Sequence, residues 1–265
     1  MPTVHANGID IAYDRSGSGP RLLFLGGSGS NLASNQPLIN LFAPNFDVLT
    51  NDQRGLGDTT APPGPYTMAD YAADAHALLD QLGWDTCRVV GISFGGMVAQ
   101  EFAVTWPERV ERLALLCTSP GGIGGASYPL HELEALPEAE RAEVQLRILD
   151  TRFTPEWLDA HPSDKQLVEF MARGRNRPKT EEQRRGEREQ LEARRHHDVC
   201  DRLHAITGPT FVGAGRYDGI APQPNAQAIV DRVPSAELHL YEGGHAFFVQ
   251  DPAAFPDVVA FLSSP

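Results

Sequence analysis

The fold of this 265-residue chain is indicated by ten consecutive residues, Val89-Val90-Gly91-Ile92-Ser93-Phe94-Gly95-Gly96-Met97-Val98. An apolar run leads into a G-x-S-x-G pattern, and a segment with helical spacing, Phe94–Thr105, follows it. A serine on a tight turn between a strand and a helix needs small neighbours, because the flanking backbone packs close to it. The turn places the Ser93 hydroxyl near a helix N-terminus, where N–H groups face developing negative charge. We therefore predict that Ser93 is a nucleophile.

Two further residues complete a catalytic pattern with this serine, because a serine nucleophile needs a base and the base needs an orienting acid. Asp218 follows the apolar run 210–212, and His245 follows two glycines after the run 236–241. Both residues therefore lie at the carboxyl ends of predicted strands, where open α/β sheets place their sites. We predict a triad of Ser93, Asp218 and His245.

Nine histidines occur in the chain, so the choice of base has rivals. His196 and His197 are the rivals by count. Both lie in a strongly charged helical run, and we expect them on the surface.

An oxyanion hole requires two N–H donors. Phe94 supplies one, because it follows the nucleophile, and a loop after an early strand supplies the second. That loop is Gly26-Gly27-Ser28-Gly29, and the Ser28 N–H is the expected donor, with Gly27 the nearest alternative. The loop lacks the G-x-x-x-x-G-K-[ST] pattern of a phosphate-binding loop, and G-x-G-x-x-G is absent after the first parallel strand.

Strands and helices alternate along most of the chain. Asn7-Gly8 is a hairpin signal that predicts strands at 3–6 and 9–13. Short, mostly apolar runs bounded by turns predict strands at 22–25, 46–50, 88–90, 113–116 and 210–212, and one more strand is expected at 236–241. A helix is predicted to begin after Thr67, because Thr67 is a good N-cap residue and Asp70 follows three residues later. A last helix is predicted from Asp251-Pro252 through Leu262. This alternation indicates an α/β protein whose mostly parallel sheet has helices on both faces.

Residues 122–203 depart from the alternation, because no buried-strand signal appears there and the stretch instead predicts several polar helices. The densest run, from Arg173 to Asp198, holds nine basic and six acidic side chains. We interpret this run as a solvated helix with many ion pairs, with a basic binding patch as the alternative. The whole stretch is typical of a helical insertion that covers one end of the sheet.

Composition excludes several classes of partner and site. The formal net charge is −13, from 22 basic and 35 acidic residues, and it disfavours nucleic acid and anionic membranes. The three cysteines form no CxxC pair, so no disulfide framework and no zinc site are indicated. Residues 1–5 carry no leader pattern and no apolar run of about 18 residues occurs, so we expect a cytoplasmic protein.

These motifs together resemble the α/β-hydrolase family over nearly the full chain. The resemblance rests on Gly91–Gly95, Asp218, His245 and the turn Asn51–Gly57, in which Asp52 and Arg54 are expected to hold neighbouring loops. It implies an eight-stranded sheet, a core of residues 1–121 and 204–265, and a helical cap inserted at 122–203 before the last strands. The chain is most similar to small esterases and lactonases such as 3-oxoadipate enol-lactonases and polyketide methylesterases. One departure is Gly26, where many relatives have histidine.

The resemblance implies hydrolysis of a carboxylic ester or lactone of a small, largely apolar molecule, with no metal and no cofactor. Carbon–carbon bond hydrolysis, thioester hydrolysis and cofactor-free perhydrolysis use the same triad and stay open, and a non-enzymatic small-molecule receptor is a further alternative. Gly27 and the insertion residues Phe153, Trp157 and Phe170 are candidate pocket residues, with ordinary packing as the alternative for the aromatic three. We expect a monomer or a homodimer.

Overall fold

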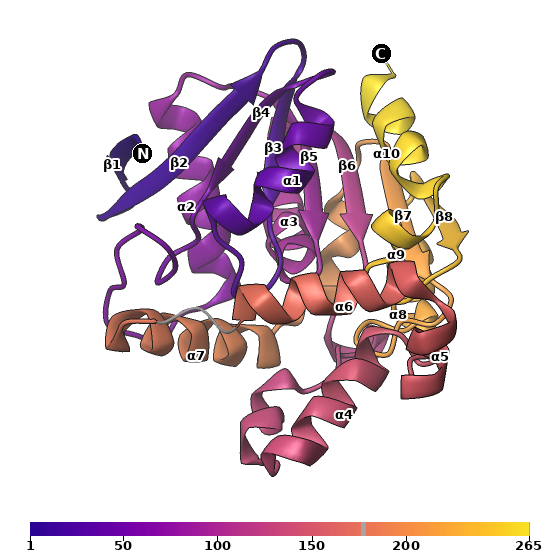
Figure 1. Cartoon of the computed structure of the whole chain (residues 1–265). Coiled ribbons are helices and arrows are strands. Elements are labelled where there is room, and N and C mark those ends of the chain that lie inside the picture. Colours follow the sequence, from indigo (N-terminus) through magenta and orange to yellow (C-terminus); the bar gives the residue numbers. More distant parts are fainter. Residues whose placement is uncertain (176–178, 265) are drawn as a thin grey trace.

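An eight-stranded sheet forms the centre of the computed structural model, which describes residues 1–175 and 179–264 (Figure 1). The strands are β1 (Thr3–Ala6), β2 (Ile9–Gly17), β3 (Arg21–Leu25), β4 (Asp47–Asn51), β5 (Cys87–Ile92), β6 (Val110–Leu116), β7 (Thr210–Gly215) and β8 (Ala236–Tyr241). They lie in the order β1-β2-β4-β3-β5-β6-β7-β8. The pairs β1–β2 and β2–β4 are antiparallel and all others are parallel, which confirms the predicted mostly parallel sheet.

Helices cover both faces of the sheet, as predicted, and each face has its own apolar core. On one face lie α2 (Met68–Gln81), α3 (Phe94–Thr105) and α8 (Gln223–Val230). On the other lie α1 (Leu32–Phe42), α9 (Phe247–Gln250) and α10 (Ala254–Ser263). Strands buried on both faces are mostly apolar, and every residue of β4 and β7 is buried, including the polar ends of β4, Asp47 and Asn51.

Local capping explains where two of these helices begin. Thr67 and Asp70 form the predicted capping box of α2, in which each side chain accepts the other residue's N–H. The last helix begins at Ala254, three residues later than predicted, because the Asp251 carboxylate holds a turn by accepting the N–H groups of Glu242 and Ala253 at 2.9 Å.

The β6–β7 connection, residues 117–209, lies at the carboxyl ends of the parallel strands, where Figure 1 shows α6 and α7 crossing the end of the sheet. It contains α4 (Glu138–Leu149), α5 (Pro155–Ala160), α6 (Pro162–Arg175) and α7 (Glu181–Arg195), with short 3-10 helices at 122–124, 130–135 and 200–205. Its two ends meet, because Gly121 and Asp198 form an antiparallel bridge. The predicted series of polar helices is therefore present, without a strand among the described residues of this connection.

The charged run 173–198 is less solvated than predicted, and its residues 176–178 lie outside the described part of the chain. In α7 the side of Gly186, Gln190 and Arg194 is buried against the rest of the protein. His196 is exposed as expected, but His197 is 6% exposed, so its predicted surface position is wrong. The reason is that the chain turns inward after α7 to rejoin the sheet.

Membrane-spanning helices and cysteine pairs are both absent from the described residues. None of their helices is both long and apolar enough to cross a lipid bilayer. All three cysteines are buried and unpaired.

Candidate active site

Ser93 occupies a strained turn between β5 and α3. Its φ of 56° and ψ of −113° lie outside the regions that L-residues ordinarily adopt. A Cβ on Gly91 would lie 2.7 Å from Gly96 Cα, and a Cβ on Gly95 would overlap the Leu25 carbonyl. The glycines of the motif are therefore required by close backbone packing, which holds Ser93 in its strained conformation.

The three predicted triad residues lie together. His245 Nε2 is 2.9 Å from Ser93 Oγ, and His245 Nδ1 is 2.9 and 3.0 Å from the two carboxylate oxygens of Asp218. An ionised carboxylate only accepts hydrogen bonds, so Nδ1 carries the ring proton and Nε2 is left to accept the Ser93 hydroxyl proton. The geometry fits proton transfer from Ser93 to His245.

Asp218 is held by backbone donors as well as by the imidazole. Its Oδ1 accepts the N–H groups of Ile220 at 2.8 Å and Ala221 at 2.9 Å. The Asp218 side chain has no exposed surface. A buried carboxylate with several donors keeps one orientation, so Asp218 is a fixed partner for the imidazole.

The end of α4 supports both loops that carry the acid and the base. The Leu149 carbonyl accepts the His245 N–H at 2.6 Å, and the Ile148 carbonyl accepts the Gly219 N–H at 3.0 Å. Thr151 N–H donates to the Tyr217 carbonyl at 2.9 Å. These contacts join residues about 70 to 100 positions apart, and no sequence motif signals them.

The predicted oxyanion loop lies beside the serine. A Cβ on Gly27 would lie 3.7 Å from Ser93 Cβ. Within the described residues, the N–H groups of Gly27 and Ser28 donate to no acceptor. Phe94 is the first residue of α3, and N–H groups in a first helical turn have no partner within their helix. Three backbone donors near Ser93 are therefore available to an anionic oxygen.

A pair of buried glutamines fixes the ends of this loop. Gln190 Oε1 in α7 accepts the Gly29 N–H at 2.7 Å, and Gln190 Nε2 donates to Gln53 Oε1 at 2.7 Å. Gln53 Nε2 donates in turn to the Gly26 carbonyl at 3.1 Å. We call this arrangement the glutamine relay. It links α7 to the loop, and sequence reasoning missed it because a glutamine in a charged helix carries no distinguishing signal.

The turn at 51–57 holds neighbouring loops, as the sequence predicts. Asp52 accepts the N–H groups of Leu32 at 2.7 Å and Asp58 at 2.8 Å, and burial raises the pKa of its carboxyl group. Arg54 forms two hydrogen bonds of 2.7 Å to the Asp74 carboxylate. Both side chains act on structure rather than on Ser93.

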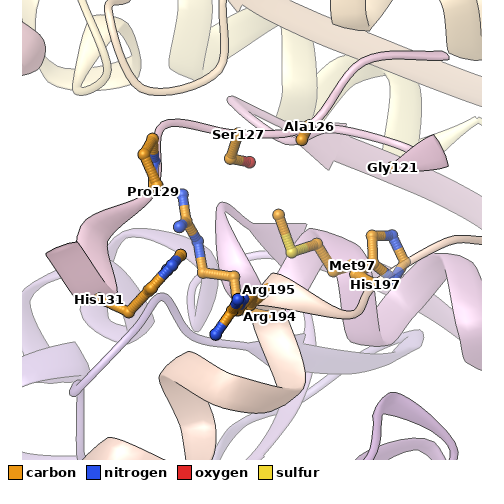
Figure 2. A pocket seen from close by; sticks show the side chains of 9 residues that line it. All are labelled: Met97, Gly121, Ala126, Ser127, Pro129, His131, Arg194, Arg195 and His197. Carbon is orange, nitrogen blue, oxygen red and sulfur yellow. The ribbon is translucent and has the colours of Figure 1, made fainter. Parts of the chain in front are cut away.

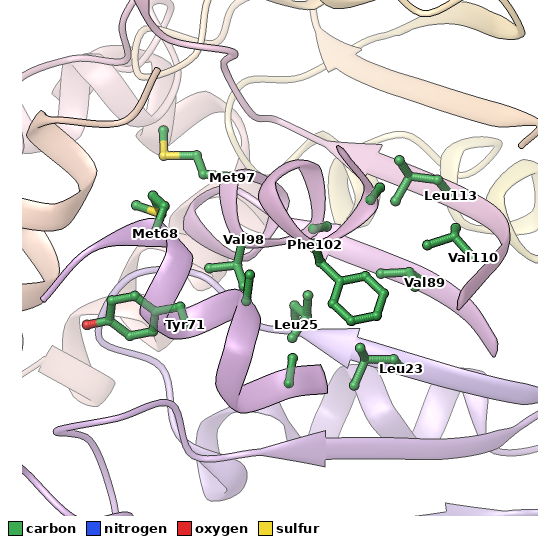
Figure 3. Close-up of a cluster of buried hydrophobic side chains, with 14 of the residues drawn as sticks. Leu23, Leu25, Met68, Tyr71, Val89, Met97, Val98, Phe102, Val110 and Leu113 are labelled. Carbon is green, nitrogen blue, oxygen red and sulfur yellow. The ribbon is translucent and has the colours of Figure 1, made fainter. Parts of the chain in front are cut away.

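A cavity of about 170 Å³ has Met97, one helical turn after Ser93, in its lining (Figure 2). Its lining residues come from α3, the segment 121–131 and the end of α7, namely Met97, Gly121, Ala126, Ser127, Pro129, His131, Arg194, Arg195 and His197. The predicted pocket aromatics do not line it. Phe153 is fully buried elsewhere, Trp157 donates to Asp164 at 2.9 Å, and Phe170 is 59% exposed. Phe153 precedes α5, Trp157 lies in α5 and Phe170 lies in α6, and none of these elements contributes a residue to the cavity lining. Among the described residues, no group of three or more His, Cys, Asp or Glu side chains could hold a metal ion.

A model of the α/β-hydrolase fold family matches residues 20–252. The chain is 30% identical over 252 residues to a poly(3-hydroxyalkanoate) depolymerase of Ectopseudomonas oleovorans, which covers 91% of this chain and 83% of that protein. It is 27% identical to a 3-oxoadipate enol-lactonase of Acinetobacter baylyi, covering 97% and 94% of the two chains. An enol-lactonase structure from Burkholderia xenovorans superposes with a TM-score of 0.81 at 22% identity, covering 99% and 100%, and supports the fold alone. The chain belongs to the α/β-hydrolase family.

Proposed function

We propose that the protein is a serine hydrolase that cleaves a carboxylic ester or lactone of a small molecule through an acyl-enzyme. The observation that carries the proposal is the continuous contact from Ser93 Oγ through His245 to Asp218, at 2.9 to 3.0 Å. The relatives named as a lactonase and a depolymerase support an ester-type substrate.

The chemistry follows from these positions. Ser93 Oγ attacks the carbonyl carbon while His245 Nε2 takes the hydroxyl proton, and Asp218 stabilises the imidazolium. The tetrahedral intermediate collapses, the carbon–oxygen bond of the ester breaks, and His245 gives its proton to the leaving alkoxide. A water molecule then attacks the acyl-enzyme as His245 removes its proton, and the acid and free Ser93 are released.

The oxyanion of each tetrahedral intermediate is bound by the Phe94 N–H and by an N–H of the 26–29 loop, from Ser28 or from the adjacent Gly27. Loss of one such donor in comparable sites costs about 3 kcal/mol of transition-state stabilisation. The donors are backbone groups, so glycine in place of histidine at position 26 does not remove them. The glutamine relay takes over the anchoring of this loop.

The β6–β7 connection acts as the cap in this proposal, with residues 122–203 over a core of 1–121 and 204–265. Its position at the carboxyl ends of the strands supports this role (Figure 1). A covered site excludes water until the acyl-enzyme forms and strengthens the hydrogen bonds to the oxyanion.

The test is covalent labelling with a fluorophosphonate, followed by hydrolysis of p-nitrophenyl esters from acetate to octanoate. The label is expected on Ser93 by peptide mass spectrometry, and Ser93→Ala is expected to lower kcat by about 10³-fold or more. Ser18→Ala, which changes an exposed serine, is the matched control and keeps wild-type rates. Equal hydrolysis by the wild type and Ser93→Ala, with no label on Ser93, refutes the proposal.

A further inference from the structure

The guanidinium of Arg194 is buried with most of its donors unused. Arg194 lies in the last turn of α7 and is 6% exposed. Its Nη1 donates to the Tyr128 carbonyl at 2.6 Å. Within the described part of the chain, its Nε and Nη2 have no hydrogen-bond partner.

A buried cation without a counter-charge is costly to a fold. Burial lowers the pKa of Arg194 to about 10, so the group stays protonated at neutral pH. The negative charge of Asp218 acts in the opposite direction on this pKa, but Asp218 already serves His245. Arg194 therefore has no counter-ion of its own among the described residues, and its positive charge is available to a ligand.

Arg194 is one of the residues that line the cavity. Figure 2 shows its side chain among those of Met97, Ser127 and His131. Met97 lies one helical turn after Ser93, and its N–H donates to the Ser93 carbonyl at 3.2 Å. Met97 therefore connects the lining of the cavity to the turn that carries the nucleophile.

A second connection joins the same arginine to the triad acid. Arg194 binds the Tyr128 carbonyl, the Tyr128 N–H donates to the Ile220 carbonyl at 2.8 Å, and the Ile220 N–H donates to Asp218. The position of the guanidinium is thus tied to the position of the triad.

The unused atoms identify the chemistry of the ligand. Nε and Nη2 form one edge of the planar guanidinium, which matches the two oxygens of a carboxylate. Three other arginines of this protein hold a carboxylate by this same edge, at 2.6 to 2.9 Å, in the pairs Arg15–Asp47, Arg54–Asp74 and Arg152–Asp150. In Arg194 this edge is buried and has no partner among the described residues, and Arg194 is one of the residues that line the cavity.

We propose that the Nε–Nη2 edge of Arg194 binds a carboxylate of the substrate, so that the substrate is an ester or lactone carrying a second, ionised carboxyl group. This assignment rests on the proposed hydrolase function and narrows its substrate class. It also replaces the expectation of a largely apolar substrate.

The kinetic test compares two kinds of ester in one assay. The neutral substrate is p-nitrophenyl butyrate, and the acidic substrates are the mono-p-nitrophenyl esters of succinic, glutaric and adipic acid. For Arg194→Gln, kcat/KM is expected to fall about 10- to 100-fold on the best acidic ester and less than about 3-fold on the neutral one. Arg194→Lys, which keeps the charge but lacks the planar edge, recovers part of the loss. Arg188→Gln removes the same charge from an exposed position of α7 and is the matched control.

A binding measurement separates the subsite from the reaction. Calorimetric titration of Ser93→Ala with glutarate is expected to show binding that the added Arg194→Gln change removes. Glutarate affinity that Arg194→Gln leaves unchanged, or an equal loss of kcat/KM on both ester types, overturns the subsite. Inorganic phosphate is titrated in parallel, and tighter binding of phosphate than of glutarate overturns the carboxylate assignment. Failure of the hydrolase proposal is recognised separately, by an unlabelled Ser93 and no turnover of any ester.

Discussion

Replacing Gly186 by alanine tests whether a backbone contact between two glycines seats α7 on the sheet. A Cβ on Gly186 would overlap the Gly55 carbonyl oxygen and lie 2.7 Å from Gly55 Cα. Both neighbours are backbone atoms, so no flexible side chain can move aside. The helix must therefore shift away from the turn that carries Gly55.

Two opposing effects decide whether Gly186→Ala raises or lowers the free energy of unfolding. Alanine favours a helix interior over glycine by about 1 kcal/mol, which would stabilise α7. Ordinary carbon–carbon contacts are about 3.5 to 4.0 Å, so the 2.7 Å approach must open by about 1 Å. Overpacking of this kind costs about 1 to 3 kcal/mol, and here it involves two main chains. The difference is a loss of about 0 to 2 kcal/mol, and because the clash is with main-chain atoms we expect Gly186→Ala to lower the free energy of unfolding by about 2 kcal/mol, the upper end of this range.

The same shift reaches the active site, because Gln190 is one turn beyond Gly186. Its bonds to Gly29 and Gln53 are both 2.7 Å, and an added 1 Å takes them beyond hydrogen-bond range. A misplacement of about 1 Å near the reacting groups can cost about 100-fold in rate. We expect kcat on p-nitrophenyl butyrate to fall about 10- to 100-fold.

Urea unfolding and steady-state kinetics measure the two effects on the same protein. Arg188→Ala, on the exposed side of α7, is the matched control and changes neither quantity by much. A Gly186→Ala protein that is about 1 kcal/mol more stable and fully active would refute the reasoning, because helix propensity would then outweigh the contact.

Three other outcomes are expected. Gln190→Leu lowers kcat, and the double change with Gln53→Leu costs less than the sum of the two single effects, as measured by a double-mutant cycle. Asp74→Asn removes the closer of the two carboxylates paired with Arg54 and leaves the more exposed Asp70 at 3.6 Å, so the free energy of unfolding falls by about 3 kcal/mol, as measured by urea titration. Burial lowers the pKa of His197 from 6.5 to about 4, so the unfolded state takes up a proton first and stability falls as the pH drops from about 6.5 to 4. His197→Asn makes that fall smaller by up to about 3 kcal/mol, as measured by unfolding at pH 7 and pH 4.5.

A specific result would contradict each of these three predictions. Strictly additive effects of the two glutamine changes would mean that they act separately. A small loss of stability in Asp74→Asn would show that water reaches Arg54. An unchanged pH dependence in His197→Asn would mean that carboxylates, rather than this buried imidazole, govern acid unfolding.

The sheet could be predicted because strands buried on both faces have a sequence signal of their own. The runs 22–25 and 113–116 are apolar without interruption, and both lie inside observed strands, as does the run 210–212, which begins with Thr210. Helix α1 was missed because its apolar positions are sparse and Pro37 lies inside it. The helix forms because Leu32, Ile39 and Phe42 are buried against the sheet, which is a tertiary effect that local pattern does not encode.

The candidate site likewise has residues that the sequence predicts and residues that only the structure reveals. Ser93, Asp218 and His245 each follow a strand within a few residues, so local motifs place them at one edge of the sheet. Gln190 and Leu149 act on the site through contacts with residues about 100 or more positions away, and nothing in their own surroundings marks them. Arg194 was assigned to a solvated helix because charge alone does not tell which side of a helix is buried.

The bonds from the end of α4 to the two loops also limit how this protein can be recombined. Residues 148–151 lie inside the β6–β7 connection, yet Ile148 and Thr151 bind the two neighbours of Asp218, and Leu149 binds His245 itself. These bonds are made by main-chain atoms, so a chimera that exchanged the whole connection with a relative would keep them only if the incoming backbone placed the same N–H and carbonyl groups beside the two loops. Residues 148–151 therefore divide the connection into two segments. We expect that each segment can be exchanged separately for that of a relative, and substrate range transferred with it, while residues 148–151 are kept unchanged.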